Sequence, residues 1–284
     1  HDGKAGVILL KIGKDGSLPD ALEKIGKRNN PNRYIIISIS SIMIFLLVWE
    51  ILTDVMHVAP AYALPSPLKV FKSFIQKFYT TAPDGATLME HVADSLVTTL
   101  LGFFSGSVIG IPLGIAMAWS QKIDKIAKTL SDMLRPIPPI AWIPIMIVVF
   151  GIGTSARVAV ILLAAFVPCV LNSYTGIKQT SEIHIWVART FGATRRQLLF
   201  KVAIPTALPY IFTGIRVSLG ASWMALVAAE LLASSKGVGY MIQTARFVGR
   251  ADLIMVGMLV IGFISMILTA LLDWFERKFV TGES

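Results

Sequence analysis

The chain has little charge and almost no cysteine. Only 15% of its 284 residues are charged, whereas 55% are hydrophobic and the mean hydropathy is +0.70; an ordinary soluble domain carries about 25% charge. The single cysteine, Cys169, lies inside an apolar block, which excludes an intrachain disulfide and favours a packing role. With apolar blocks of membrane-spanning length, this composition predicts an all-α, polytopic membrane protein.

The sequence also lacks the usual signatures of catalytic and nucleotide sites. It has no Gly-x-x-x-x-Gly-Lys-Ser/Thr loop, so we expect no ATP to bind to this chain. Its four histidines are scattered, and no serine or cysteine nucleophile has recognisable partners. We therefore predict no enzyme, no metal site and no cofactor bound by this chain. The net charge of +9 comes from basic residues between the apolar blocks, not from a basic and aromatic face, so no nucleic acid partner is expected.

Six apolar blocks predict about six transmembrane helices, because crossing the hydrocarbon takes about 17–25 residues. Gly151-Ile152-Gly153 separates the third block from the fourth, which favours a tight turn between two spans; a single re-entrant hairpin is the alternative. The blocks are Tyr34–Leu52, Ser95–Trp119, Pro136–Phe150, Arg157–Leu171, Leu208–Leu232 and Ile254–Leu272.

Lysine and arginine residues between the blocks predict the orientation. Most of them precede the first span, lie between the second and third or fourth and fifth spans, or follow the last one. Because cytoplasmic loops are enriched in these residues, both termini are expected in the cytoplasm. The resulting organisation is a cytoplasmic N-terminal segment (1–33), a first transmembrane helix (34–59), an outer loop with an interfacial helix (60–94), a core (95–275) that carries a loop at 181–205, and a cytoplasmic tail (276–284).

Two segments show a clear helical pattern. In the outer loop, one apolar face predicts a helix lying on the membrane surface, and we favour simple anchoring over contact with a partner protein. In the second span, glycines recur every four residues, which predicts a smooth face for close helix packing. The apolar face consists of Val70, Phe71, Phe74, Ile75 and Phe78, and the glycines are Gly102, Gly106, Gly110 and Gly114.

The longest cytoplasmic loop has an unusual set of helix signals. Ser181 is placed to cap a helix over 182–191 that Gly192 ends. Thr194 and Gln197 have the spacing of a capping box, which predicts a second helix, and Pro205 is expected to limit its length. The product is a compact, arginine-rich helix–glycine–helix element. A rigid basic projection of this kind indicates a docking surface.

This loop also resembles a known motif. Trp186-Val187-Ala188-Arg189-Thr190-Phe191-Gly192, nine residues and then Val202-Ala203-Ile204-Pro205 is similar to the "EAA" loop of bacterial ABC importer permeases. The chain keeps the second alanine, the glycine and the proline of that motif, and it departs at the glutamate, which is Trp186 here, and at the first alanine, which is Val187.

Further motifs extend the resemblance over most of residues 60–275. They are similar to the permeases for taurine, aliphatic sulfonates, nitrate and bicarbonate, with the taurine type as the nearest. The motifs are Leu64–Pro67, Arg135–Pro144, Phe150–Gly153, Pro209–Arg216 and Ala228–Leu231.

The resemblance implies a type I ABC importer permease fold in the bacterial cytoplasmic (inner) membrane, with residues 95–275 as the permease core. It implies two copies of an ATPase subunit that hold ATP and Mg, a second copy of this permease, a periplasmic or lipid-anchored substrate-binding protein, and membrane lipid around the spans. The substrate expected is taurine or another sulfonate; a nitrate or bicarbonate permease and a stand-alone secondary transporter are alternatives. In the ATPase-coupling segment, the implied contact residues are Glu182, Ile183, Trp186, Ala188, Arg189, Gly192, Ala193, Arg195, Arg196 and Pro205.

Four residues inside the spans are candidates for the translocation path or its gate. Ionisable residues within a membrane are costly and therefore indicate function. Arg216 either snorkels to the interface or faces the path. Glu230 either forms part of an outer gate or a docking contact for the binding protein, or is a plain interfacial residue or a helix-pair partner. Trp142 and Trp223 line the path or pack in the core.

Overall fold

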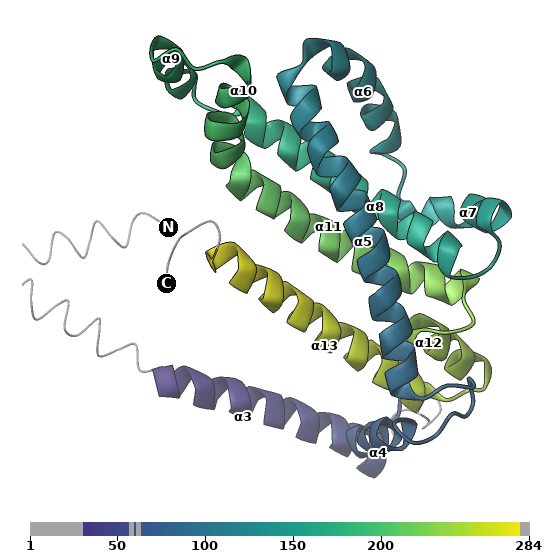
Figure 1. The fold of residues 1–284 in the computed structure, drawn as a ribbon. Coiled ribbons are helices and arrows are strands. Elements are labelled where there is room, and N and C mark those ends of the chain that lie inside the picture. The colour runs from purple at the N-terminus through teal and green to yellow at the C-terminus, as the bar shows by residue number, and fades with distance from the viewer. Residues whose placement is uncertain (1–30, 57–59, 61–63, 279–284) are drawn as a thin grey trace, which may run out of the picture. The chain divides into compact units, whose positions relative to one another are not determined.

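The structure is a computed structural model that describes residues 31–56, 60 and 64–278, and every regular element in these ranges is helical (Figure 1). The chain divides into two compact units, residues 1–60 and 61–284. Most of the predicted N-terminal segment (1–33) and of the predicted tail (276–284) lies outside the described residues. The predicted all-α architecture is confirmed.

The first unit contains helix α3 (Pro31–Glu50), which continues into a π-helical turn, η1 (Ile51–Val55). Its stretch Ile36–Asp54 is long and apolar enough to cross a membrane. Large apolar side chains such as Ile37, Phe45 and Leu47 are exposed around it. Lipid is the solvent that such an all-round apolar surface requires.

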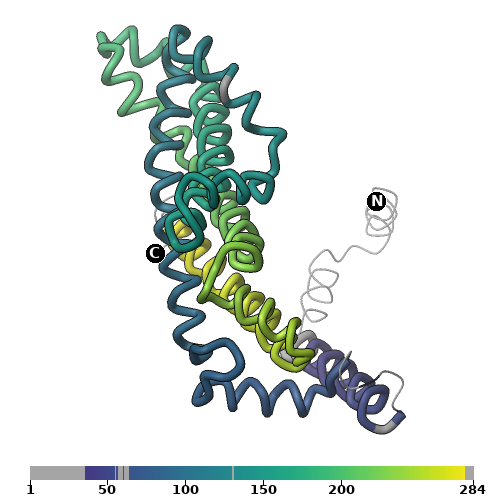
Figure 2. The backbone as a smooth tube through the Cα atoms, turned by 90° about the vertical axis from the view of Figure 1, so that its right-hand side faces the viewer, coloured from purple at the N-terminus to yellow at the C-terminus, as the bar shows by residue number. Residues whose placement is uncertain are grey.

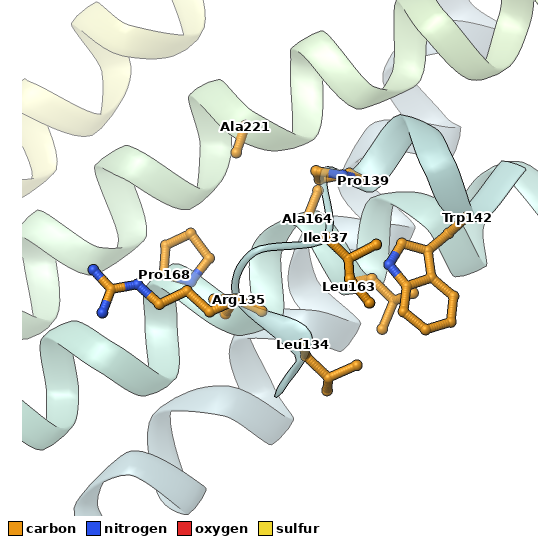
Figure 3. A pocket seen from close by; sticks show the side chains of 10 residues that line it. Leu134, Arg135, Ile137, Pro139, Trp142, Leu163, Ala164, Pro168 and Ala221 are labelled. Carbon is orange, nitrogen blue, oxygen red and sulfur yellow. The ribbon is translucent and has the colours of Figure 1, made fainter. Parts of the chain in front are cut away.

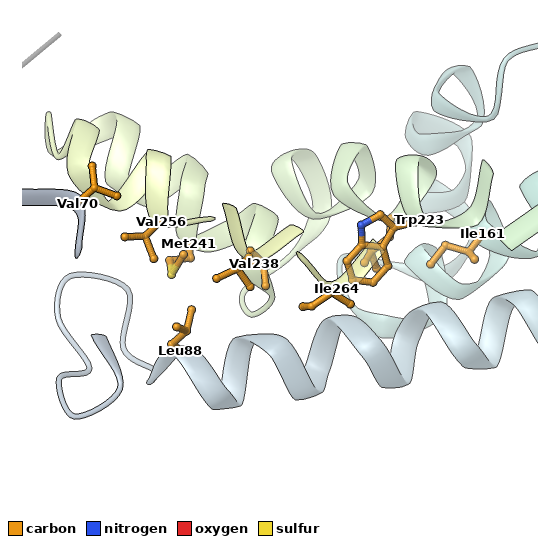
Figure 4. Packing of buried hydrophobic residues seen from close by; sticks show 10 residues of the cluster. Val70, Leu88, Ile161, Trp223, Val238, Met241, Val256 and Ile264 are labelled. Carbon is orange, nitrogen blue, oxygen red and sulfur yellow. The ribbon is translucent and has the colours of Figure 1, made fainter. Parts of the chain in front are cut away.

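The second unit is built on four long helices, α5 (Leu88–Trp119), α8 (Thr154–Lys178), α11 (Ile204–Ala233) and α13 (Ala251–Glu276). Helix α8 packs against both α5 and α11, as Figures 1 and 2 show. Two shorter helices, α4 (Pro67–Lys77) and α12 (Val238–Phe247), pack against α13 near its start. The buried core near α12 joins these parts through a cluster that includes Val70, Leu88, Trp223, Met241 and Val256 (Figure 4).

The predicted glycine face of the second span packs against α8. A methyl group added at Gly106 would meet the Leu162 carbonyl oxygen at 2.5 Å, and one at Gly110 would meet the Phe166 carbonyl oxygen at 2.8 Å. These contacts are with backbone, which cannot move aside as a flexible side chain does. Helices α5 and α8 therefore approach each other closely because the residues between them have no side chain.

The third predicted span is not one straight helix. The described residues hold five helices long and apolar enough to span, or six if a bent pair is counted as one span. That pair joins α6 (Gln121–Leu134) to the 3₁₀ turn η2 (Pro139–Trp142) and α7 (Ile143–Phe150) across a bend of 89°. The predicted block 136–150 begins inside this proline-rich break, and its helical part is η2 and α7, residues 139–150. The turn at 151–153 is confirmed, with both glycines at positive φ.

Pro205 does not end the second loop helix, contrary to the prediction. Helix α10 (Arg195–Leu198) passes through a π-helical turn, η3 (Leu199–Ala203), directly into α11, and the run 195–233 is continuously helical. Pro205 falls in the first turn of α11, where its missing N–H disturbs least. The loop is consequently joined to α11 without a flexible connection.

Helix α12 and helix α6 were not expected from the sequence. Helix α4 was expected in the outer loop from its apolar face. Its apolar face is divided: Val70 is buried in the core, whereas Phe71 is 60% exposed. Anchoring of the exposed part of α4 on the membrane surface stays a prediction.

Candidate functional site

The loop after α8 forms a projection at one end of the second unit (Figure 1). It consists of α9 (Glu182–Thr190), the turn 191–194 and α10. No residue of α9 is buried, and three large apolar side chains on or next to it, Ile183, Trp186 and Phe191, are 70%, 67% and 88% exposed. Aromatic and aliphatic side chains left exposed in this way are typical of an interaction surface.

Backbone bonds make this projection rigid. Gly192 has a φ of 79°, and its N–H donates to the Arg189 carbonyl at 2.8 Å, while the Ala193 N–H donates to the Ala188 carbonyl at 3.0 Å. The left-handed backbone at Gly192 ends α9, as the sequence predicted. The capping box is also confirmed, because Thr194 N–H donates to Gln197 Oε1 at 2.8 Å and Gln197 N–H to Thr194 Oγ1 at 3.4 Å. Ser181 occupies the N-cap of α9 without a side-chain bond to it.

The projection is fixed to the long helices beneath it. The Arg195 guanidinium donates to the Trp119 carbonyl at 3.1 Å and lies 6.0 Å from the centre of its indole ring, at the end of α5. A cation at a helix C-terminus also interacts favourably with the helix dipole. Ala203, Ala207 and Ile177 form a buried cluster beneath η3. The projection is thereby attached to α5, α8 and α11.

At the other end of the unit, α12 begins against buried polar side chains of α5 and α11. The N–H groups of Gly237, Val238 and Gly239 donate to His91 Nδ1 at 3.1 Å, Ser95 Oγ at 2.9 Å and Glu230 Oε2 at 2.8 Å. Each of these acceptors is at most 1% exposed. The first N–H groups of a helix lack internal acceptors, so these side chains supply the bonds that α12 needs to start there.

Glu230 is also bonded laterally to α5 and α8. Its Oε1 accepts a bond from Ser95 Oγ at 2.7 Å and lies 3.5 Å from the Arg157 guanidinium, which donates to Asp94 at 2.7 Å. Glu230 is 1% exposed. We name Asp94, Ser95, Arg157 and Glu230 the Glu230 network. These bonds are those of a helix-pair partner, and the roles of Glu230 in an outer gate or toward a binding protein stay predictions.

Two more polar clusters hold the segment before α5. Lys77 forms a buried ion pair with Asp84 and donates to the Ala86 carbonyl at 2.9 Å. Burial by itself raises the pKa of Asp84, but the neighbouring His91 and Lys77 lower it by more, so the pKa lies below the ordinary 3.8. Ser73 Oγ donates to Asp252 at 2.6 Å and joins α4 to α13.

Arg216 pairs with α13. Its guanidinium lies 2.8 Å from Asp273 and also binds Glu276, and it is 46% exposed. Asp273 is therefore an ion-pair partner of Arg216. Arg216 serves at least to connect α11 to α13.

Residues at the bend between α6 and α7 line a half-open pocket of about 190 Å³ (Figure 3). Trp142, from η2, lines it together with residues of α8 and α11, and its place on the translocation path stays a prediction. Trp223, by contrast, is 4% exposed and belongs to the core cluster near α12, so its core-packing interpretation is the one that the structure bears out.

The candidate residues thus fall in separate places. Nine of the ten coupling residues lie on the projection and the tenth, Pro205, lies beyond η3 in the first turn of α11. Trp142, Arg216, Trp223 and Glu230 do not converge on one site. The sequence interpretation missed Arg157 as a buried partner of Glu230 and Arg135 as a pocket residue. The sequence did contain a signal for the pair of Arg157 and Glu230. Arg157 begins the fourth apolar block and Glu230 lies near the end of the fifth, and two consecutive spans bring these ends to the same side of the membrane.

An all-helical unit with several apolar spans and a projecting, firmly attached loop defines a multi-pass membrane transport subunit. Residues 110–282 match the family of binding-protein-dependent transport system inner membrane components, and the chain belongs to this family. It is accordingly a permease component of the ABC importer class.

Named relatives and solved structures agree with this assignment. The taurine transport system permease protein TauC of Escherichia coli is 36% identical over 251 residues, which cover 87% of this chain and 90% of TauC. The bicarbonate transport system permease protein CmpB of Synechococcus elongatus is 30% identical over 278 residues, covering 95% of this chain and 98% of CmpB. An inward-facing structure of the MetNI methionine ABC transporter has the same fold, with a TM-score of 0.58 and 21% identity over 69% of this chain and 95% of that one.

Proposed function

We propose that this permease moves taurine or another small sulfonate across the bacterial inner membrane. The observation that carries the proposal is the 36% identity to a taurine permease over 87% of the chain, against 30% to a bicarbonate permease. A nitrate or bicarbonate permease is the second candidate, because relatives of that type match the chain over a similar length.

In this proposal the chemistry of ATP belongs to partner subunits. Two ATPase subunits hold ATP and Mg, the permease acts with a second copy of itself, and a periplasmic or lipid-anchored binding protein delivers the substrate. The exposed apolar residues of α9 support a protein partner at the projection. The absence of a phosphate-binding glycine loop in the sequence supports placing ATP elsewhere.

The proposed orientation places the projection in the cytoplasm and α12 outside. Basic residues support it: Arg189 and Arg196 lie in the projection, Lys201 follows in η3, and Lys122, Lys125 and Lys128 lie on α6, at the same end of the unit (Figure 1). Such an excess of lysine and arginine marks the cytoplasmic side. Both termini are then cytoplasmic.

The coupling mechanism follows from the attachment of the projection. Ile183, Trp186 and Phe191 seat in the ATPase, and closure of the ATPase pair moves α9. Because α9 leads back to α8, and α10 continues into α11, the movement passes to both helices as rigid bodies. The permease then exchanges inward- and outward-facing arrangements.

Reconstituted transport tests the proposal. The permease is assembled in proteoliposomes with the ATPase and binding protein of its own host, and ATP-driven uptake of taurine, ethanesulfonate, nitrate and bicarbonate is compared. Uptake of taurine or ethanesulfonate is expected, and uptake of nitrate or bicarbonate alone would contradict the proposed substrate.

The coupling residues are tested in the same assembly. Trp186→Asp is expected to release the ATPase from the purified complex and to abolish uptake, because it places a charge in an apolar contact. Phe247→Asp is the control, since Phe247 is an exposed aromatic residue on α12, away from the projection. Retention of the ATPase by Trp186→Asp, or its loss in both variants, would contradict the proposed docking surface.

A further inference from the structure

Helix α12 lies at the opposite end of the second unit from the projection (Figure 1). Helix α11 connects the two, because it continues from α10 through η3 and is separated from α12 by residues 234–237. Its 30 residues extend over about 45 Å at the rise of an α-helix. A movement that starts at α9 therefore has to cross this distance before it reaches α12.

The start of α12 fits closely around the Glu230 carboxylate. Gly237 has a φ of 112°, which favours glycine, and a methyl group there would overlap the carboxylate. The Gly239 N–H donates to Glu230 Oε2 at 2.8 Å, and a methyl group at Gly239 would lie 3.0 Å from the Val227 carbonyl oxygen. The first turn of α12 can approach α11 this closely because both residues are glycine.

A single arginine joins the third long helix to this junction. Arg157, on α8, is buried; its guanidinium donates to Asp94 of α5 at 2.7 Å and lies 3.5 Å from Glu230 Oε1. Its other terminal nitrogen donates to Thr154 Oγ1 at 3.0 Å, which fixes the orientation of the fork. The Glu230 network thus connects α5, α8 and α11 at one end, beside the start of α12.

The bonds of the Glu230 network form or break together. Glu230 is buried, so water does not replace a bond that is lost, and a buried charge without its partner is strongly unfavourable. A packed interface with such bonds has discrete arrangements and does not slide gradually. The intact network therefore holds α5, α8, α11 and the start of α12 as one rigid body.

The same three long helices are also joined at the end that carries the projection. Arg195 binds the last residue of α5 through the Trp119 carbonyl, and the buried cluster of Ile177, Ala203 and Ala207 joins α8 to η3 and α11. Helices that are attached to one another at both ends move together, because neither end is free to turn alone. A displacement of the projection is then carried to α12 without loss.

We propose that Glu230 and Arg157 are positioning residues for ATP-driven transport. By holding α12 on α5, α8 and α11, they make the outer end of the permease follow the movement that the ATPase starts at the projection. The inference rests on the proposed coupling through the projection and on the proposed orientation, and it does not depend on which solute is carried. Without the network, the ATPase still moves α9, but α12 no longer follows.

The amount of solute taken up per ATP hydrolysed measures this coupling in proteoliposomes that contain the ATPase and the binding protein. Glu230→Gln keeps the size of the side chain and removes its charge, so the Gly239 N–H loses a charged acceptor. We expect uptake to fall by at least about tenfold, the factor for one charged hydrogen bond, while ATP hydrolysis without binding protein is kept. Equal losses of uptake and ATP hydrolysis, or no loss of either, would contradict the proposal.

Arg250→Gln is the matched control. It removes the ion pair of Arg250 with Asp252, at the start of α13 and outside the Glu230 network. The uptake per ATP of this variant should equal that of the unmodified transporter. The same loss in Arg250→Gln as in Glu230→Gln would mean that any broken ion pair at this end uncouples transport, and that the network has no special role.

Exchange of the two charges separates the Glu230 network from a simple ion pair. Arg157→Glu combined with Glu230→Arg restores opposite charges, but it leaves the Gly239 N–H facing a cation and fills the space beside Gly237. This double variant should stay uncoupled, and restored coupling would show that Glu230 does not act by holding α12. Arg157→Lys keeps the charge and should therefore retain more coupling than Arg157→Gln does.

A distance measurement tests the rigid body directly, whether or not a variant transports. Spin labels are attached to cysteines introduced at Met89, in the first turn of α5, and at Phe247, the last residue of α12, both of which are exposed, whereas Cys169 is buried. Complexes assembled with an excess of unlabelled permease carry one labelled copy. The distance should be narrowly distributed with and without ATP, and broadly distributed in Glu230→Gln. An equally narrow distribution in Glu230→Gln would overturn the proposal.

The unmodified transporter separates a failure of this inference from a failure of the proposed function. If its uptake needs ATP but Glu230→Gln keeps both the coupling and the narrow distance, the role of the Glu230 network is wrong and the proposed function stands. If its uptake needs no ATP, the proposed function is wrong, and the coupling role of the network fails with it.

Discussion

Ser95 Oγ donates a hydrogen bond to Glu230 Oε1 at 2.7 Å. Ser95 Oγ also accepts a hydrogen bond from the Val238 N–H at 2.9 Å. A single buried hydroxyl thus joins α5 to α11 and to the first turn of α12. The loop 234–237 between α11 and α12 is short and keeps the start of α12 near the end of α11. The hydrogen bonds to Ser95 and Glu230 then fix the position of that start. Gly237 and Gly239 leave the necessary room, because a methyl group at Gly239 would meet Glu230 Cβ at 2.8 Å.

Ser95→Ala tests this junction. It leaves the Val238 N–H and Glu230 Oε1 without that partner in a dry interior, so we expect a loss of about 1–3 kcal/mol in unfolding free energy. Ser105→Ala on the same helix is the control, because Ser105 Oγ bonds only its own helix carbonyl at Leu101, and it should change stability by less than about 0.5 kcal/mol. Thermal unfolding in detergent measures both, and equal effects would show that the junction contributes nothing specific.

Gly106→Ala is expected to disrupt the packing of α5 on α8. The added methyl group would lie 2.5 Å from the Leu162 carbonyl oxygen, and overpacking of this kind costs about 1–3 kcal/mol. Gly262→Ala is the matched control, because a methyl group there meets nothing within 4 Å, and alanine is the better helix former by about 1 kcal/mol. Denaturant unfolding of the two variants should therefore change in opposite directions, and a stable Gly106→Ala protein would contradict the close approach.

Features formed by residues close together in the chain could be predicted from the sequence. Glycines at intervals of four identify a packing face because the helical period alone places them together, and the Thr194–Gln197 box is recognisable because both partners are local. The same holds for Gly192 as the end of α9. In each case the residues that interact lie within about a turn or along one helix.

The features that the sequence did not reveal depend on contacts between residues far apart in the chain or on how helices pack against one another. The pairing of Arg157 with Glu230 joins positions far apart in the chain. The prolines after Arg135 are compatible either with a single kinked span or with a sharp bend between two helices. The packing of α7 against α8 selects the sharp bend. The π-helical turn before Pro205 likewise lets α11 continue where proline ordinarily ends a helix.

Because of Asp84, we expect the stability of the folded protein to fall in acid. Because its pKa in the folded protein lies below the ordinary 3.8, its contribution to stability is complete above that value and is lost as the pH falls through the lower folded value. The unfolding temperature should therefore decrease between about pH 5 and pH 3 through this group, which unfolding scans in detergent would record.

Asp84→Asn should remove that part of the pH dependence. It should also lower stability at neutral pH by about 3–5 kcal/mol, because Lys77 keeps a buried charge without its partner. Asp132→Asn, an exposed position on α6, is the control and should keep the slope of the unmodified protein. An unchanged slope in Asp84→Asn would mean that other carboxylates cause the acid sensitivity.

Gly192 provides the sharpest test of the projection as a rigid lever. Its φ of 79° is unfavourable for a branched side chain, although a methyl group there would meet nothing within 4 Å, so any effect of substitution comes from the backbone. Gly192→Val costs about 1–2 kcal/mol in this conformation and should reduce ATP-driven uptake by about 5–30-fold. Asparagine tolerates the left-handed region, so Gly192→Asn should retain most of the uptake at an equal membrane level. Uptake by both variants is measured together with ATP hydrolysis in proteoliposomes. Equal uptake by the valine and asparagine variants would show that the end of α9 does not have to be rigid for transport.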